Sequence, residues 1–139
     1  MLEAVVGYTA NKIYIVASDF LCNKIKEEIP EIPEFNFIKE PSGKNTAPAI
    51  GLAALHIYKK HPKGVMAIYP ADHLIQGKKR FISTMKAAEA VAEKEDVLMT
   101  IGIKPTYAAT GYGYIQCSSN ENSTNENIYN VKTFAEPCL

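Results

Sequence analysis

Residues 40–50 carry the strongest chemical signal in this sequence, in the order Glu-Pro-Ser-Gly-Lys-Asn-Thr-Ala-Pro-Ala-Ile. A short apolar stretch precedes the run and a helical pattern follows it, so we expect a turn from a strand into a helix. Asn45 or Thr46 can cap this helix with a side-chain oxygen, and Pro48 is tolerated in the first turn. Backbone N–H groups at a helix start attract anions, and Lys44 adds a positive charge beside them. The run is typical of a ligand-binding turn, although an ordinary strand-to-helix turn also explains it.

Asp72 is the second candidate for chemistry, because it follows the apolar residues 65–69 directly after a Pro-Ala step. A carboxylate at the carboxyl end of a strand is well placed to hold Mg²⁺, which takes one or two protein carboxylates together with phosphate oxygens. The alternative is that Asp72 caps a short turn. His73 fits a structural hydrogen-bonding residue better than a base. No serine or cysteine stands at a motif spacing from it, so nucleophilic catalysis has no support.

Gly111, Tyr112 and Gly113 form the third candidate. Two glycines allow a ligand to approach the backbone closely, and the tyrosine between them offers a ring and a hydroxyl. This combination suits a polar ligand such as a sugar. A twisted edge strand with aromatic packing explains the same residues almost as well.

The elements that must position these residues alternate along the chain. Apolar or β-branched runs predict strands at residues 13–17, 36–39, 65–69 and 97–103, and helical periodicity predicts helices at residues 20–29, 47–61 and 78–94. Such alternation indicates an α/β fold with a mostly parallel sheet and helices on both of its faces. Two more strands, at residues 111–117 and 128–134, flank a polar loop at residues 118–127 and predict a C-terminal β-hairpin.

The periodicity also predicts which side of each helix faces the core. We expect Ser18 to cap the first helix. The residues expected to point inward recur at helical spacing: Leu21, Ile25 and Ile29 in the first helix, Ile50, Ala53, Ala54 and Ile57 in the second, and Phe81, Met85, Ala88 and Ala92 in the third.

Composition limits the classes of function. With 139 residues, 47% hydrophobic and 22% charged, the chain has the size of a single globular domain covering residues 1–139. Because 15 basic residues balance 15 acidic ones, charge gives no case for nucleic-acid or membrane binding. No apolar run approaches the ~20 residues that span a bilayer. Three cysteines without a CxxC spacing fit a reducing, cytoplasmic location and argue against a zinc site or a disulfide framework.

Four motifs then occur in order, at residues 40–50, 70–73, 102–106 and 110–115. Together they resemble the mannose-1-phosphate guanylyltransferase family, and the resemblance extends from about residue 11 to residue 136. It implies the nucleotide-diphospho-sugar transferase fold, which is Rossmann-like in its nucleotide half. It also implies the Mg²⁺-dependent reaction of GTP with mannose 1-phosphate, which gives GDP-mannose and pyrophosphate without a protein nucleophile.

The resemblance assigns a role to each candidate residue. It implies that nucleotide binding involves Glu40, Lys44, Asn45, Thr46 and Ala47. Asp72 would be the catalytic residue that coordinates magnesium. The residues implied to approach or hydrogen-bond the mannose are Gly111, Tyr112, Gly113 and Glu136.

Three departures from the family pattern stand beside these matches. Residues 1–10 do not resemble the family's opening strand and its glycine-rich, arginine-containing loop. Glu136 and Pro137 are adjacent where the family has an intervening lysine, and Ala109 stands where an acidic residue is common. We therefore expect an internal piece of such an enzyme, a partial domain truncated at both ends. By itself, this piece should not turn over.

Two alternatives stay open beside this interpretation. One is another sugar-phosphate nucleotidyltransferase of the same fold that uses a different base or sugar. The other is a non-catalytic domain that binds a nucleotide sugar or regulates another protein. A truncated sheet would also leave strand edges and apolar surface exposed, so we expect self-association into a homo-oligomer or poor solubility.

Overall fold

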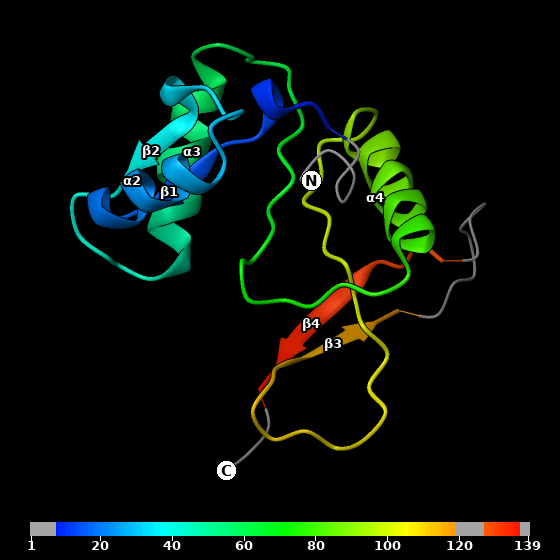
Figure 1. Ribbon diagram of the computed structural model, residues 1–139. Helices are drawn as coiled ribbons and strands as arrows, with labels where there is room; N and C mark the ends of the chain where they lie inside the picture. The colour runs from blue at the N-terminus through cyan, green and yellow to red at the C-terminus, as the bar shows by residue number, and fades with distance from the viewer. Residues whose placement is uncertain (1–7, 119–126, 137–139) are drawn as a thin grey trace. The chain divides into compact units, whose positions relative to one another are not determined.

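The computed structural model describes residues 8–118 and 127–136 (Figure 1). The chain divides into two compact units, Met1–Leu98 and Met99–Leu139. The first unit holds, in order, η1 (Ala10–Lys12), β1 (Ile15–Ala17), α2 (Asp19–Glu28), η2 (Glu34–Asn36), β2 (Phe37–Lys39), α3 (Thr46–Tyr58) and α4 (Lys78–Ala92). The second holds β3 (Tyr114–Cys117) and β4 (Val131–Ala135).

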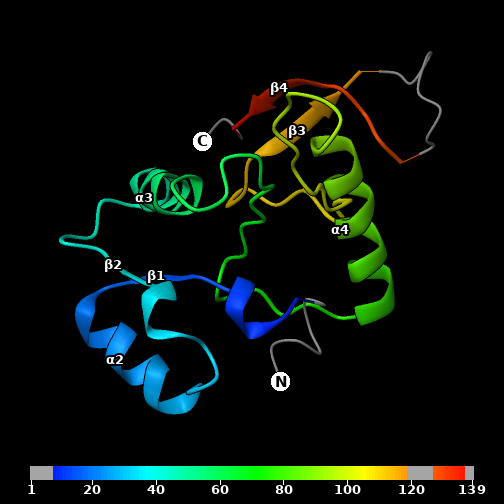
Figure 2. The same cartoon turned by 90° about the horizontal axis from the view of Figure 1, so that it is seen from above.

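A parallel pair of strands forms the centre of the first unit. β1 and β2 pair in the register Ile15↔Phe37, Val16↔Ile38 and Ala17↔Lys39. Two parallel neighbours need a crossover between them, and α2 supplies it. Helices α2 and α3 lie on opposite faces of the pair (Figure 2). The predicted parallel pairing and the helices on both faces are therefore confirmed for these two strands.

Helix α2 begins where the sequence predicts. The Ser18 hydroxyl accepts a hydrogen bond from the Leu21 N–H at 3.4 Å, which confirms the predicted N-cap. The predicted inward residues Ile25 and Ile29 are partly covered, but Leu21 is 48% exposed and its neighbour Cys22 is buried instead. The Cys22 Sγ donates to the Ala17 carbonyl oxygen at 3.5 Å, so the helix turns this residue toward β1. Burial is also the main cause that raises the pKa of the Cys22 thiol.

Asn36 is the one fully buried polar side chain among the described residues. Its Nδ2 donates hydrogen bonds of 2.9 Å to the carbonyl oxygens of Asn11 and Ile13. These bonds attach the segment that leads into β1 to the residue that precedes β2. They therefore fix where the two strands begin relative to each other.

Helix α3 presents the predicted stripe to the core. Ala53 is buried and Ile50, Ala54 and Ile57 are partly covered, whereas Leu55 is 67% exposed on the other side. The regular helix ends at Tyr58, three residues before the predicted end. A turn continues it, in which the His61 N–H donates to the Ile57 carbonyl oxygen at 2.8 Å.

Two predicted strands, at residues 65–69 and 97–103, do not form in the described part of the chain. Both segments lack ladder partners, and Leu98 and Ile103 are 102% and 85% exposed. A parallel strand needs the N–H and C=O groups of a neighbouring strand, and β1 has β2 as its only neighbour among the described residues. An apolar pattern indicates that a segment can be buried, but it becomes a strand only if a neighbouring strand pairs with it. These two segments have no such neighbour in the described part of the chain. The prediction of four parallel strands is therefore wrong in this structure.

Helix α4 confirms its prediction closely. It begins after Gly77, whose φ of 73° lies in the left-handed region that glycine adopts without strain. Its predicted inward residues, Phe81, Met85, Ala88 and Ala92, are all at least partly covered, and so are Ile82, Glu89 and Val91.

The second unit contains the predicted hairpin. β3 and β4 pair antiparallel from Tyr114↔Ala135 to Cys117↔Val131, with an irregularity between Gln116 and Cys117. The regular strand starts at Tyr114, because the backbone bends through the two glycines that precede it. The Ser118 N–H donates to the Asn130 carbonyl oxygen at 2.9 Å and continues the pairing into the connection. Residues 119–126 of the predicted loop lie outside the described residues.

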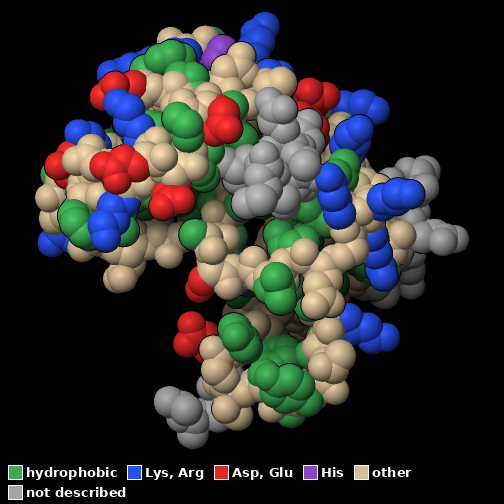
Figure 3. All heavy atoms as spheres, viewed as in Figure 1, with side chains coloured by type: hydrophobic (Ala, Val, Ile, Leu, Met, Phe, Trp, Pro, Cys, Tyr) green, Lys and Arg blue, Asp and Glu red, His purple; other side chains and the backbone are tan. Residues whose placement is uncertain are grey.

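Apolar side chains lie open at the surface in several places (Figure 3). The most exposed include Leu74, Leu98, Ile103 and Phe134. No helix in the described segments has both the length and the apolar character needed to cross a bilayer.

We expect this exposed apolar surface to drive self-association. Contacts between copies would bury side chains such as Leu98 and Ile103, which now contact water. Light scattering of the purified chain over a dilution series should show a mass that falls toward 15.3 kDa only at low concentration. A monomer at every concentration would contradict the prediction.

We also expect Asn36→Ala to destabilise the first unit by about 2 kcal/mol, because it removes two hydrogen bonds and leaves their carbonyl acceptors without this donor. Urea unfolding followed by circular dichroism measures the loss. The matched control is Asn23→Ala at an exposed position of α2, where alanine should be neutral or slightly stabilising. Equal midpoints for the two variants would show that the Asn36 hydrogen bonds contribute nothing.

Candidate functional site

The turn between β2 and α3 lies where parallel α/β folds bind ligands. β2 ends at Lys39, and the Glu40 N–H donates to the Ala17 carbonyl oxygen at 2.9 Å, which ties the start of the turn to the end of β1. The chain then turns and enters α3 at Thr46. The candidate nucleotide-binding residues therefore occupy the carboxyl end of a parallel strand pair, as the sequence predicts.

The turn also holds an unusual backbone conformation. Asn45 has φ 66° and ψ −170°, and it is the one non-glycine residue with positive φ in the described ranges. This region is almost restricted to glycine and costs on the order of 1–3 kcal/mol for other residues. Its side chain makes no capping hydrogen bond to α3, so the predicted cap by Asn45 or Thr46 is wrong. The reason is conformational, because a capping residue normally has an extended backbone with negative φ.

An uncapped helix start leaves donors available. The first N–H groups of α3 have no side-chain acceptor, and Lys44, Asn45, Thr46 and Ala47 are all exposed. Pro48 occupies the first turn, where its missing N–H costs no hydrogen bond. The turn therefore offers backbone N–H groups and the positive end of a helix to an anion.

The cations on either side of the turn differ in their partners. Lys39 pairs with Asp19, and that hydrogen bond raises the pKa of the Lys39 ammonium. Lys44 has no ion-pair partner within the described segments. Of these two cations, Lys44 is the one free to meet a bound phosphate.

Asp72 lies in the exposed connection between residue 69 and α4. Its side chain is 87% exposed, and its nearest ionisable partner is the His73 Nε2 at 4.0 Å. Asp72 lies in a turn with Ala71, but its carboxylate accepts no hydrogen bond from other described residues, so the alternative that it caps this turn has no hydrogen bond behind it. The described residues also contain no group of three or more His, Cys, Asp or Glu side chains that could enclose a metal ion. A single open carboxylate fits a cation that is shared with substrate phosphates, which is how Mg²⁺ is commonly held.

The second unit brings two of the sugar-binding candidates together. The ladder ends at the pair Tyr114↔Ala135, so Gly113 comes directly before β3 and Glu136 directly after β4, at the same end of the hairpin. A Cβ at Gly113 would lie 3.6 Å from the Ala135 carbonyl oxygen, which shows how closely the backbones approach. Tyr112 is 72% exposed just before the strand. The Tyr114 hydroxyl donates to the Ala109 carbonyl oxygen at 2.8 Å and fixes the bend that carries Gly111.

Comparison with known proteins adds the decisive observation, since the profile of the nucleotidyl transferase family matches residues 1–137. The chain belongs to the nucleotidyl transferase family. This assignment confirms the predicted α/β class and the resemblance on which the predicted roles rest. Members of this family commonly use a divalent metal ion.

Curated relatives are similar to this nucleotidyl transferase chain over much of its length. A mannose-1-phosphate guanylyltransferase of Escherichia coli is 46% identical over 106 residues, which are 73% of this chain and 22% of the relative. Mannose-1-phosphate guanylyltransferase 2 of Escherichia coli O157:H7 is 33% identical over 138 residues, or 94% of this chain and 28% of the relative. Xanthan biosynthesis protein XanB of Xanthomonas campestris is 41% identical over 85 residues, which are 61% of this chain and 18% of the relative. The chain spans less than a third of the length of each relative.

The candidate site residues lie in three separate parts of the structure. Glu40 and residues 44–47 share one turn, Asp72 lies in a separate connection of the same unit, and Gly113 and Glu136 share the hairpin of the other unit. No hydrogen bond or ion pair between described residues joins Asp72 to the turn. Sequence reasoning missed Asn36 and Tyr69, although a polar residue between two phenylalanines and a tyrosine before the Pro-Ala-Asp step are both visible signals.

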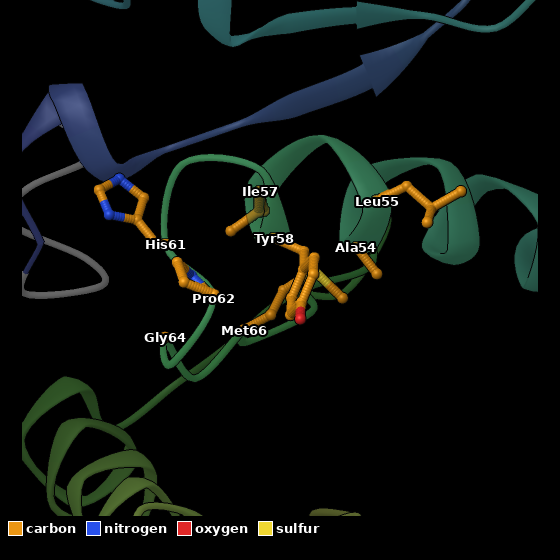
Figure 4. Close-up of a pocket in the computed structure, with 8 residues that line it drawn as sticks. All are labelled: Ala54, Leu55, Ile57, Tyr58, His61, Pro62, Gly64 and Met66. Carbon is orange, nitrogen blue, oxygen red and sulfur yellow. The ribbon is translucent and has the colours of Figure 1, made fainter.

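A hollow of about 350 Å³ lies at the other end of α3 (Figure 4). Its lining includes Ile57 and Tyr58 of the helix and Pro62 and Met66 of the segment that follows. Because a helix rises about 1.5 Å per residue, the ends of α3 are roughly 18 Å apart. The hollow is apolar and contains none of the predicted site residues, so it does not suit a nucleotide.

We expect the strained backbone at Asn45 to lower the free energy of unfolding. Asn45→Gly should raise the urea midpoint and Asn45→Ala should lower it, because glycine alone adopts this φ and ψ freely. The difference between the two variants should be about 1–2 kcal/mol. At Asn23, in the middle of α2, the order should reverse, because alanine favours a helix and glycine does not. An alanine variant at position 45 as stable as the glycine variant would contradict the strained conformation.

Proposed function

We propose that this chain is part of a mannose-1-phosphate guanylyltransferase, which transfers a guanylyl group from GTP to mannose 1-phosphate. The observation that carries the proposal is the turn before α3, with its strained Asn45, its uncapped helix start and its unpaired Lys44. The names of the similar proteins support the choice of base and sugar. Residues 1–139 would then form part of a single nucleotidyltransferase domain.

In this reaction a phosphate oxygen of mannose 1-phosphate attacks the α-phosphorus of GTP. The bond between the α-phosphorus and the bridging oxygen breaks, and pyrophosphate leaves with that oxygen. Neither step forms a covalent bond to the protein. The residues have to bind both substrates, align the attacking oxygen with the leaving group, and stabilise negative charge on the phosphates.

Lys44 and the backbone N–H groups of Thr46 and Ala47 would bind the nucleotide phosphates from one side. Their positions are set by α3, whose dipole also favours the bound anion. Glu40 and the Asn45 side chain would complete the pocket with hydrogen bonds to the nucleotide. The strain at Asn45 would then be offset by a backbone direction that suits the ligand.

Asp72 would hold Mg²⁺ together with substrate phosphate oxygens. A bound cation would neutralise the charge that develops as pyrophosphate leaves. The carboxylate is suited to this role because its oxygens are open and have no hydrogen-bonded partner in the described ranges.

In the second unit, Gly111 and Gly113 would let the mannose approach the backbone, with Tyr112 beside it. Glu136, which directly follows β4, would accept hydrogen bonds from the sugar hydroxyls. The unpaired Cys22 and Cys117 fit a reducing compartment, so we place the reaction in the cytoplasm.

Calorimetric titration with GTP, GDP-mannose and ATP, each with and without MgCl₂, tests the proposal. We expect the guanine nucleotides to bind better than ATP and to need the cation. Lys44→Ala should weaken binding at least tenfold, because a charge-assisted hydrogen bond is lost. Asp72→Asn should remove the dependence on Mg²⁺.

Two exposed residues of the same unit provide matched controls. Lys63→Ala and Asp96→Asn make the same chemical changes away from the candidate site and should leave binding unchanged. Equal affinity for ATP would refute the choice of GTP. Loss of binding in the control variants as well would refute a specific role for Lys44 and Asp72.

A further inference from the structure

The segment that carries Asp72 is exposed throughout but is closed at its two ends. Every residue from 70 to 80 is exposed, whereas the residues on either side, Tyr69 and Phe81, are partly covered. The rings of Tyr69 and Phe81 pack against each other with centroids 5.9 Å apart and planes inclined by 60°. The segment between them, a loop at residues 70–77 followed by the first turn of α4, is therefore closed at its ends by an aromatic pair.

Little else holds this loop among the described residues. Apart from a turn at Ala71 and Asp72, no structure holds residues 70–76, which form no hydrogen bond to described residues outside this segment. The first bond after them joins the Phe81 N–H to the Gly77 carbonyl oxygen at 3.1 Å. A chain without such bonds samples many conformations, and joining its ends removes a large part of that freedom. The ring pair therefore limits where the loop, and Asp72 within it, can lie.

Tyr69 is itself held against α4 near a second contact. Glu89 lies two turns after Phe81 on the same side of the helix and accepts a hydrogen bond of 3.1 Å from the Tyr8 hydroxyl. The Tyr69 hydroxyl oxygen is buried and has no hydrogen-bond partner in the described part of the chain. The position of Tyr69 therefore depends on its ring rather than on its hydroxyl.

We propose that Tyr69 and Phe81 are positioning residues, which pack ring against ring across the base of the loop and hold the Asp72 carboxylate in place for a divalent cation. The inference rests on the proposed role of Asp72. It adds that the cation affinity of Asp72 depends on two side chains that do not touch the cation. Loosening the pair should scatter the carboxylate over many positions and weaken binding.

Because the chain has no tryptophan, Leu74→Trp introduces a single fluorescent reporter into the loop at a side chain that is 86% exposed. Time-resolved anisotropy of this variant measures local motion of the loop. Adding Tyr69→Ala, Phe81→Ala or the milder Phe81→Leu should increase the fast component of the decay. Tyr69→Phe keeps the ring and should not change it.

Phe35→Ala is the control for loss of an aromatic contact elsewhere in the unit, since it removes the ring beneath Lys60 and leaves the loop alone. Circular dichroism identifies variants that keep the helices. An unchanged decay in folded Tyr69→Ala and Phe81→Leu would overturn the inference.

Affinity for Mn²⁺ in the presence of GTP, measured from the electron paramagnetic resonance signal of the free ion, supplies the second readout. In the chain without the Leu74→Trp reporter, Tyr69→Ala and Phe81→Leu should weaken Mn²⁺ binding about fivefold, which corresponds to the interaction energy of such a ring pair. Tyr69→Phe should leave the affinity unchanged. If Asp72→Asn weakens binding but the ring variants do not, the positioning role fails while the proposed metal site stands. If Asp72→Asn binds Mn²⁺ like the unaltered chain, the metal role itself fails, and the inference with it.

Discussion

The first unit depends on the amide of Asn36. Its two hydrogen bonds join the segment before β1 to the residue before β2, so they set the register of the parallel pair. That register brings the Glu40 N–H to the Ala17 carbonyl oxygen, which fixes the point where the chain leaves the strands and turns toward α3. A buried amide thereby helps to fix where the turn that carries the candidate nucleotide-binding residues begins.

Features that depend on neighbouring residues could be predicted from the sequence. The Ser18 cap, the inward stripes of α3 and α4, and the strand-turn-helix order around Lys44 all follow from local spacing, and the structure contains them. The strands predicted at residues 65–69 and 97–103 depend on a partner elsewhere in the chain, which an apolar run does not specify. Leu21 illustrates the same limit, because the strand carbonyl that meets Cys22 decides which of two adjacent side chains turns inward.

The candidate site divides in the same way. Residue type and position identify Lys44 as a group that could meet a phosphate and Asp72 as one that could hold a metal ion. The sugar-binding role of Glu136 comes only from the resemblance to the family. Two features come only from the geometry: the positive φ of Asn45, and the hairpin register that brings Gly113 and Glu136 to the same end of the β3–β4 pair. An asparagine before a helix reads as a cap, and only backbone angles show that it is a strained turn residue instead.

Nucleotidyl transfer makes such positional effects unusually important. With no protein nucleophile in the reaction, catalysis comes from alignment and charge, and both depend on distance. A carboxylate on an unrestrained loop would spend most of its time away from the phosphates, whatever its intrinsic affinity for a cation. The side chains that fix a loop then matter to the reaction as much as the carboxylate does. For Asp72 we propose that those side chains are Tyr69 and Phe81, whose rings pack against each other at the two ends of its segment.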